Sequence, residues 1–218
     1  MAGDSATGHT TLMYFKSFYL AVLLGLTALV AGCSSDGSPR FFTAEYGALT
    51  DAGYKLPSIP IEQVPSKFRR QVVTYKTAEQ PGTIIVDTKE KFLYFVMENG
   101  KAMRYGIGVG REGFGWSGTA RVAMKREWPT WTPPAEMIKR QPQLAKWAGG
   151  MPPGLDNPLG ARALYLFNKS GDTGYRLHGT PEWKSIGQAM SSGCIRLLNQ
   201  DIIDLYNRTK TGAKVIVR

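Results

Sequence analysis

The sequence predicts a mainly β domain with a few short helices over roughly its last 135 residues. Three observations point to this fold class. Short runs are rich in β-branched and aromatic residues, turn-forming residues separate those runs, and only two segments show a helical pattern. A domain of this length can enclose one hydrophobic core.

The strands are predicted in order along the chain. Residues 83–87 (Thr-Ile-Ile-Val-Asp) and 92–97 (Phe-Leu-Tyr-Phe-Val-Met) form the first two. Residues 98–101 (Glu-Asn-Gly-Lys) form a hairpin turn because Asn-Gly accepts the backbone angles of tight turns, and residues 102–108 return as the partner strand. Further strands are predicted at residues 120–124, 163–168, 175–178 and 214–217.

Two stretches have a helical pattern. Residues 134–147 are expected to hold one or two short helices, and residues 199–210 a longer one that Asn199 caps and Gly212 ends. Ile202, Leu205 and Tyr206 share one face of that helix. Between the two stretches, residues 149–160 contain three Pro and four Gly, which indicates either a lid or a long connection.

The N-terminus has the order of a secretory signal. After Lys16, an apolar segment at residues 18–32 leads to Ala31-Gly32-Cys33, which resembles the bacterial lipobox, whose cysteine receives diacylglycerol and becomes the new N-terminus. We therefore expect residues 1–32 to be a lipoprotein signal peptide, with Met13 as a candidate start, and Cys33 to be lipidated. A transmembrane anchor is the alternative, but the segment is shorter than the usual ~20 residues.

Residues 33–80 are expected to be the lipidated N-terminus and a semi-ordered spacer that ends in one strand at 71–75, and residues 82–218 the catalytic domain. Ser34 follows the lipidation site, so the aspartate signal for inner-membrane retention is missing. This predicts a periplasmic protein anchored to the outer membrane. The net charge of +10 suits an acidic wall or lipid surface, or simple solubility. Export and scattered basic residues argue against nucleic acid as a partner.

Apart from Cys33 and His9, which belong to the N-terminal region, the chain has one cysteine and one histidine, Cys194 and His178. A neighbouring imidazole is the common way to activate a thiol nucleophile. Gly193 permits a sharp backbone at the thiol, and its amide and that of Cys194 would be free to bind an oxyanion. Zinc needs more ligands than these, so we expect neither a metal nor another cofactor.

These residues resemble a known family. His178-Gly179-Thr180 followed by Ser-Ser-Gly-Cys-Ile-Arg-Leu at 191–197 is similar to the signature of the L,D-transpeptidase catalytic (YkuD-like) domain. Segments at 81–87, 128–134 and 157–164 support the resemblance, which covers residues 82–218. It implies a YkuD-like β-sandwich or barrel. Many members carry His, Arg or Lys where this chain has Ser192, which puts a contribution from that side chain in doubt.

The resemblance implies acyl transfer on peptidoglycan stem peptides. Cys194 would attack the third residue of a tetrapeptide to give a thioester, and His178 would carry the proton. The acceptor would be an amine of a second stem, a lysine of an envelope protein, or water. Supporting roles fall to Gly179, Ser191 and Gly193. Arg196 would bind a stem carboxylate or form an internal salt bridge, and Trp116, Trp128 and Trp131 would wall the substrate groove or pack in the core.

Two alternatives remain open. A carboxypeptidase, endopeptidase or amidase would use the same thioester chemistry with a different acceptor. A lipoprotein that binds wall peptides without turning them over is the other, although the intact pair of His178 and Cys194 argues against it. Sortases share the order His, Cys, Arg, but their Thr-x-Thr-Cys context is missing.

Overall fold

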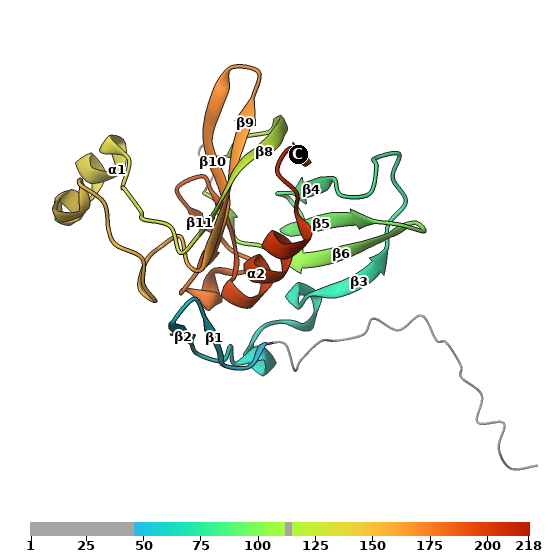
Figure 1. Cartoon of the computed structure of the whole chain (residues 1–218), viewed down its shortest axis with the longest axis horizontal. Coiled ribbons are helices and arrows are strands. Elements are labelled where there is room, and N and C mark those ends of the chain that lie inside the picture. The colour runs from blue at the N-terminus through green and yellow to red at the C-terminus, as the bar shows by residue number, and fades with distance from the viewer. Residues whose placement is uncertain (1–45, 112–114) are drawn as a thin grey trace, which may run out of the picture. The chain divides into compact units, whose positions relative to one another are not determined.

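The computed structural model describes residues 46–111 and 115–218, which belong to one compact unit (Figure 1). The expected signal peptide, the start at Met13 and the lipidation site Cys33 lie outside the described residues. No helix within the described ranges is long and apolar enough to cross a membrane.

The main structural element is an open nine-stranded sheet. All neighbouring strands are antiparallel except the pairs β10/β12 and β4/β13, which are parallel. Its strands in spatial order are β12 (Ile195–Leu198), β10 (Gly171–Thr180), β9 (Arg162–Asn168), β8 (Gly118–Glu127), β13 (Lys214–Val217), β4 (Ile84–Asp87), β5 (Phe92–Met97), β6 (Lys101–Gly106) and β3 (Gln71–Thr74).

Two small sheets and six short helical segments complete the described fold. The small sheets pair β1 (Leu49–Asp51) with β2 (Tyr54–Leu56), and β7 (Val109–Gly110) with β11 (Ala189–Ser191). The α-helices are α1 (Ala135–Arg140) and α2 (Asn199–Arg208), and the 3₁₀ segments are η2 (Ile61–Gln63), η3 (Ser66–Phe68), η4 (Pro142–Trp147) and η5 (Trp183–Ser185). The mainly β prediction with a few short helices is confirmed, but the sheets do not close into a barrel.

The two halves of the large sheet share one hydrophobic core. Ile84, Leu93 and Tyr105 come from the β4–β6 half, and Leu164 and Leu177 come from the β9–β10 half. The helix α2 adds Ile202 and Leu205, and Figure 1 shows it between the two halves. These side chains are fully buried, so the core fixes the position of β10 and β12 relative to the rest of the domain.

Local sequence signals explain the β5–β6 hairpin. Asn99 and Gly100 have φ of 59° and 65°, the left-handed conformation that Asn and Gly accept at low cost. Met97 therefore pairs with Lys101 across a short turn, and the predicted hairpin is confirmed.

The predicted ends of α2 need correction. The N-cap of α2 is Leu198, without a side-chain cap, and the Asn199 side chain instead accepts a 2.9 Å hydrogen bond from the backbone N–H of Ala161. The helix ends at Arg208, before Gly212, which lies in a later turn with φ of 91°. Asn199 thus joins α2 to Ala161, which directly precedes β9. The local sequence pattern did not reveal this contact because the two residues are far apart in the sequence.

Residues 46–70, expected to be a semi-ordered spacer, are instead part of the folded unit. Tyr46, Val64 and Phe68 are buried in a second apolar cluster with Phe92 and Leu198. The β1–β2 hairpin is held by Asp51, whose carboxylate forms hydrogen bonds of 2.6 and 2.8 Å with the Arg162 guanidinium. The spacer interpretation failed because these contacts join residues far apart in the sequence, which a local pattern does not contain.

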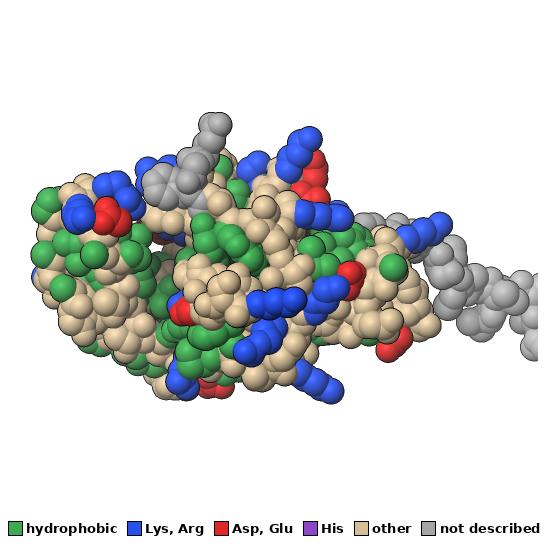
Figure 2. All heavy atoms as spheres, turned by 90° about the horizontal axis from the view of Figure 1, so that it is seen from above, with side chains coloured by type: hydrophobic (Ala, Val, Ile, Leu, Met, Phe, Trp, Pro, Cys, Tyr) green, Lys and Arg blue, Asp and Glu red, His purple; other side chains and the backbone are tan. Residues whose placement is uncertain are grey.

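Basic side chains are distributed widely over the surface. On the face in Figure 2, Lys and Arg side chains predominate over Asp and Glu, in keeping with the net charge of +10. Such a surface attracts anions in general without selecting one.

Candidate active site

The parallel pairing of β10 with β12 arranges the site. Leu177 is opposite Ile195, and both side chains are buried in the core. Because side chains alternate along a strand, His178 and its register partner Arg196 lie on the other face. Cys194 directly precedes Ile195, so the thiol is carried at the entrance to β12, the strand that pairs with the His178 strand.

His178 is buried and oriented by the backbone. Its side chain is 4% exposed, and Nδ1 lies 2.6 Å from the carbonyl oxygen of Gly179. Burial lowers the pKa of His178 to about 4. The Gly179 carbonyl opposes this shift, while the charges of Arg196 and Arg176 add to it. The imidazole is therefore neutral at neutral pH. The backbone carbonyl of Pro158 is a second acceptor at the ring and, like that of Gly179, favours the protonated form.

Gly179 has a packing role as well. A Cβ on this residue would collide with the Asn199 side chain and press against Ile202 and Ala161. Only glycine therefore lets α2 approach β10 this closely while its carbonyl faces the imidazole. The His-Gly pair of the sequence thus combines an orienting acceptor with a close helix contact.

Cys194 is partly buried, and its sulfur lies 3.9 Å from the carbonyl oxygen of Gly174. Burial raises the pKa of the thiol. A hydrogen bond from the backbone N–H of Arg176 and the charges of Arg176 and Arg196 oppose the shift, whereas Asp172 adds to it. In the resting site the Cys194 thiol and the His178 imidazole are therefore both neutral at neutral pH.

Ser191 braces the loop that carries the thiol. Its hydroxyl donates to the carbonyl of Cys194 at 2.6 Å and accepts from the Gly193 N–H at 3.2 Å. Gly193 has φ of 127°, a conformation that favours glycine. The expectation that the Gly193 amide is free to bind an oxyanion is wrong in this arrangement, because Ser191 occupies it.

A bulge in β10 was not predicted. The pairing with β9 shifts register between Asp172 and Arg176, and Gly174 within this stretch has φ of 76°. Asp172 and Arg176 form a two-pronged ion pair at 2.7 Å, and the guanidinium also lies 4.3 Å from the Tyr165 ring centre. The bulge brings the backbone carbonyl of Gly174 and the backbone N–H of Arg176 close to the sulfur of Cys194. In the sequence, only Gly171 and Gly174 indicate this bulge.

Arg196 forms an internal salt bridge. Its guanidinium lies 2.7 Å from Glu182, and its backbone exchanges two 2.9 Å hydrogen bonds with Gly108. Of the two interpretations drawn from the sequence, this arrangement matches the salt bridge. Its charge still reaches both His178 and Cys194.

The three tryptophans occupy different places. Trp116 stacks on Tyr175 with ring centres 5.6 Å apart and lines a groove beside the thiol loop. Trp131 exchanges backbone hydrogen bonds with Met151 in the loop region and does not line that groove. Trp128 is buried, stacks on Tyr54 and donates to Asp51. Trp116 therefore lies nearest the predicted substrate path.

The groove beside the thiol loop has a volume of about 810 Å³. Gly193 and Ile195, the two neighbours of Cys194, line it together with Trp116 and Tyr175, and Lys89 and Lys91 line it as well.

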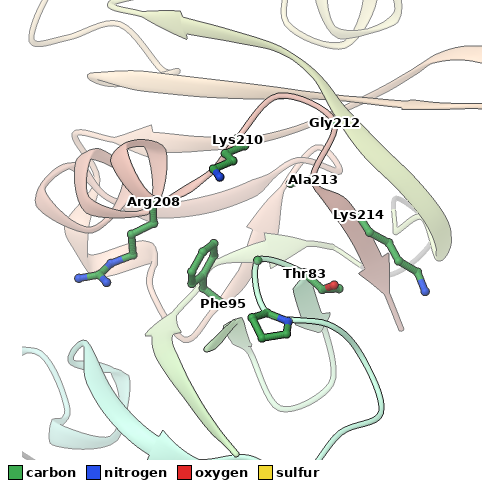
Figure 3. A pocket seen from close by; sticks show the side chains of 9 residues that line it. Thr83, Phe95, Arg208, Lys210, Gly212, Ala213 and Lys214 are labelled. Atoms are coloured by element: carbon green, nitrogen blue, oxygen red, sulfur yellow. The ribbon is translucent and has the colours of Figure 1, made fainter. Parts of the chain in front are cut away.

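A second hollow of about 420 Å³ lies elsewhere, around Phe95 (Figure 3). Two of its cations are already paired, Arg208 with Asp204 and Lys214 with Glu79, and it contains no nucleophile. Within the described ranges, no three His, Cys, Asp or Glu side chains gather as a metal site.

Comparison with known proteins assigns the family. A family model described as the L,D-transpeptidase catalytic domain matches residues 81–217, more than half of the chain. The chain belongs to the L,D-transpeptidase catalytic domain (YkuD) family.

Its relatives include the probable L,D-transpeptidases YcfS and YbiS of Escherichia coli K12. They are 35% and 32% identical over 63% and 62% of this chain, which correspond to 44% and 43% of their own lengths. The matched part thus spans less than half of either relative. A crystal structure titled as a probable carnitine operon oxidoreductase caia from Brucella melitensis is 45% identical, with a TM-score of 0.50, over 73% of this chain and 99% of that one.

Proposed function

We propose that this protein is a peptidoglycan L,D-transpeptidase that works through a thioester on Cys194. The observation that supports the proposal is the pairing of β10, which carries the oriented imidazole of His178, with β12, which directly follows Cys194. Membership of the L,D-transpeptidase family supports the substrate class, the stem peptides of the wall.

In the first half of the reaction, the sulfur of Cys194 bonds to the carbonyl carbon of the third stem residue while His178 Nε2 accepts the thiol proton. The tetrahedral intermediate then loses the terminal D-alanine. Its carbon–nitrogen bond breaks, and His178 returns the proton to the leaving amine. A thioester remains on Cys194. The neutral resting pair suits this sequence because deprotonation and attack occur together.

In the second half, an acceptor amine attacks the thioester carbonyl, His178 accepts the amine proton, and the carbon–sulfur bond breaks. The thiolate then recovers that proton from the imidazolium. An amine of a second stem gives a 3-3 cross-link, and a lysine of an envelope protein gives protein anchoring. Water as acceptor would make the protein a carboxypeptidase, the nearest rival activity.

The full chain should be tested on purified sacculi, with products identified by mass spectrometry of muropeptides. We expect 3-3 cross-linked dimers or tripeptide stems, and neither product with Cys194→Ala. Unchanged muropeptides with binding to sacculi retained would instead indicate a wall-binding protein that does not turn its ligand over.

We also propose that the protein is a lipoprotein of the outer membrane that faces the periplasm. The support is the sequence at residues 31–33 followed by Ser34. Labelled palmitate should enter the wild type and not Cys33→Ala, which should leave the membrane fraction. Equal labelling of the two proteins would overturn this location.

A further inference from the structure

We propose that the groove beside the thiol loop recognises a carboxylate of the acyl-donor peptide through Lys89 and Lys91. The inference rests on the proposed function and deepens it, because it names the donor chemistry that the site selects. Its evidence is the charge of the groove wall, the backbone of Lys91 and the junction between the groove and the loop.

The charged side chains that line the groove within the described residues are all of one sign. Among the described residues that line it, Lys89, Lys91 and Arg111 are cationic, and none is Asp or Glu. The ammonium of Lys91 lies 3.4 Å from the carbonyl oxygen of Lys89, a contact that leaves other N–H groups for a ligand. Asp87 and Glu90 belong to the same turn but do not line the groove. An anionic group is therefore the natural occupant of this side.

The backbone of Lys91 gives an independent observation. Lys91 has φ of 61°, a conformation that costs a non-glycine residue on the order of 1 kcal/mol and that Asn or Gly accepts more readily. The carbonyl of Lys91 accepts a 3.1 Å hydrogen bond from the N–H of Ile107, which fixes it there. A long cationic side chain thus occupies a strained position on the groove rim, where Asn would be the more stable residue.

The groove is joined to the nucleophile loop. The N–H of Arg111 donates to the carbonyl of Ser191 at 3.0 Å, and Ser191 in turn holds Gly193 and Cys194. Tyr175 also lines the groove. Burial raises the pKa of Tyr175, and a charge on Cys194 raises it further, so this tyrosine lies near the thiol.

The donor is the better occupant on geometric grounds. It must place its carbonyl carbon against the sulfur of Cys194, so its flanking residues extend past Gly193 or Ile195, the two groove residues that adjoin the thiol. A carboxylate carried by those residues would then face the lysines. Partly exposed charge pairs are weak because water screens them, so two should give roughly a two- to thirtyfold preference for the acid over the amide.

Binding should be measured first, on the full chain with Cys194→Ala so that turnover plays no part. The probes are a tetrapeptide donor with free internal carboxylates and the same peptide with those carboxylates amidated. We expect the acid form to bind roughly two- to thirtyfold more tightly, and K89Q/K91Q to remove that preference. The matched control K55Q/K101Q removes two exposed lysines outside the groove and should retain it. A preference that survives in K89Q/K91Q would overturn the proposal.

Turnover then separates donor from acceptor. In K89Q/K91Q we expect a higher KM for the acid donor, little change in kcat, and an unchanged dependence on acceptor concentration. A change confined to the acceptor would contradict the assignment to the donor. Lys91→Asn should melt no lower than wild type yet lose part of the preference, because it relieves the backbone and removes one of the two charges. If wild type binds selectively but turns nothing over, the proposed function fails and the groove assignment stands.

Discussion

The Nδ1 of His178 lies 2.6 Å from the carbonyl oxygen of Gly179, and this contact orients the buried imidazole. The carbonyls of Gly179 and Pro158 both favour a protonated ring, but burial outweighs them. Together with the lowered pKa of His178 and the raised pKa of Cys194, the contact describes a site that rests uncharged and ionises during the reaction.

The uncharged resting pair has a measurable pH dependence. Because burial raises the pKa of Cys194, alkylation by iodoacetamide should be slow at neutral pH and should rise through an inflection above the usual thiol pKa of about 8.5. A thiolate–imidazolium pair would instead react fast from about pH 5 upward. The rate of alkylation from pH 5 to 10, with Cys194→Ala as the blank, distinguishes the two. A plateau of fast reaction below pH 7 would contradict the neutral pair.

Asp172→Asn should slow acyl transfer by roughly tenfold or more while the protein stays folded. The change breaks the ion pair that holds Arg176 and the β10 bulge beside the sulfur. Asp172 also raises the pKa of Cys194, so the alkylation inflection should move to lower pH, a shift that a purely structural role would not produce. Glu98→Gln in the exposed β5–β6 turn is the control. An unchanged inflection together with unchanged turnover would remove Asp172 from the site.

Asp51→Asn should lower the stability of the whole domain by about 1.5–3 kcal/mol, the usual contribution of a hydrogen bond to a charged group, because Asp51 is only partly buried. It takes the charge partner from Arg162 and weakens the bond to Trp128, whose φ of 42° is strained for so large a residue. Burial alone would raise the pKa of Asp51, but hydrogen bonds from Arg162 and Trp128 outweigh it and hold the pKa below 3.8.

The stabilisation is therefore present above pH 3.8 and is lost as the pH falls through the lower folded-state pKa. Melting temperatures of wild type and Asp51→Asn should differ most near pH 7 and converge in acid. Glu136→Gln, which breaks an exposed pair with Lys139, should change the melting temperature little. Deletion of residues 1–60 removes the β1–β2 hairpin and should also lower the melting temperature. An unchanged melting temperature would show that the hairpin does not stabilise the domain.

The sequence predicted the elements whose causes are local. The Asn99-Gly100 turn, the apolar strands on both sides of it and the amphipathic face of α2 all depend on neighbouring residues. The sequence did not reveal contacts that join distant segments, such as Asp51 with Arg162 or Asn199 with Ala161. The expectation of a free Gly193 amide was wrong because the Ser191 hydroxyl reaches that amide only once the loop is folded.

The site divides in the same way. The motif at residues 178–197 indicated the thiol and the imidazole as the candidate pair, but the β10 bulge and the salt bridge of Arg196 depend on tertiary packing. His178 and Cys194 are neutral mainly because both are buried. The sequence shows that one His and one Cys are present in the folded part, but not how deeply they are buried.

The thioester on Cys194 is the central claim, and intact-protein mass spectrometry tests it most directly. The full chain is mixed with a tetrapeptide donor without an acceptor amine, quenched in acid and weighed. We predict an added mass equal to the donor minus its terminal D-alanine, released by hydroxylamine, formed on the order of 10²–10⁴-fold more slowly in His178→Gln and absent in Cys194→Ala. Release of D-alanine that continues in Cys194→Ala would contradict the account.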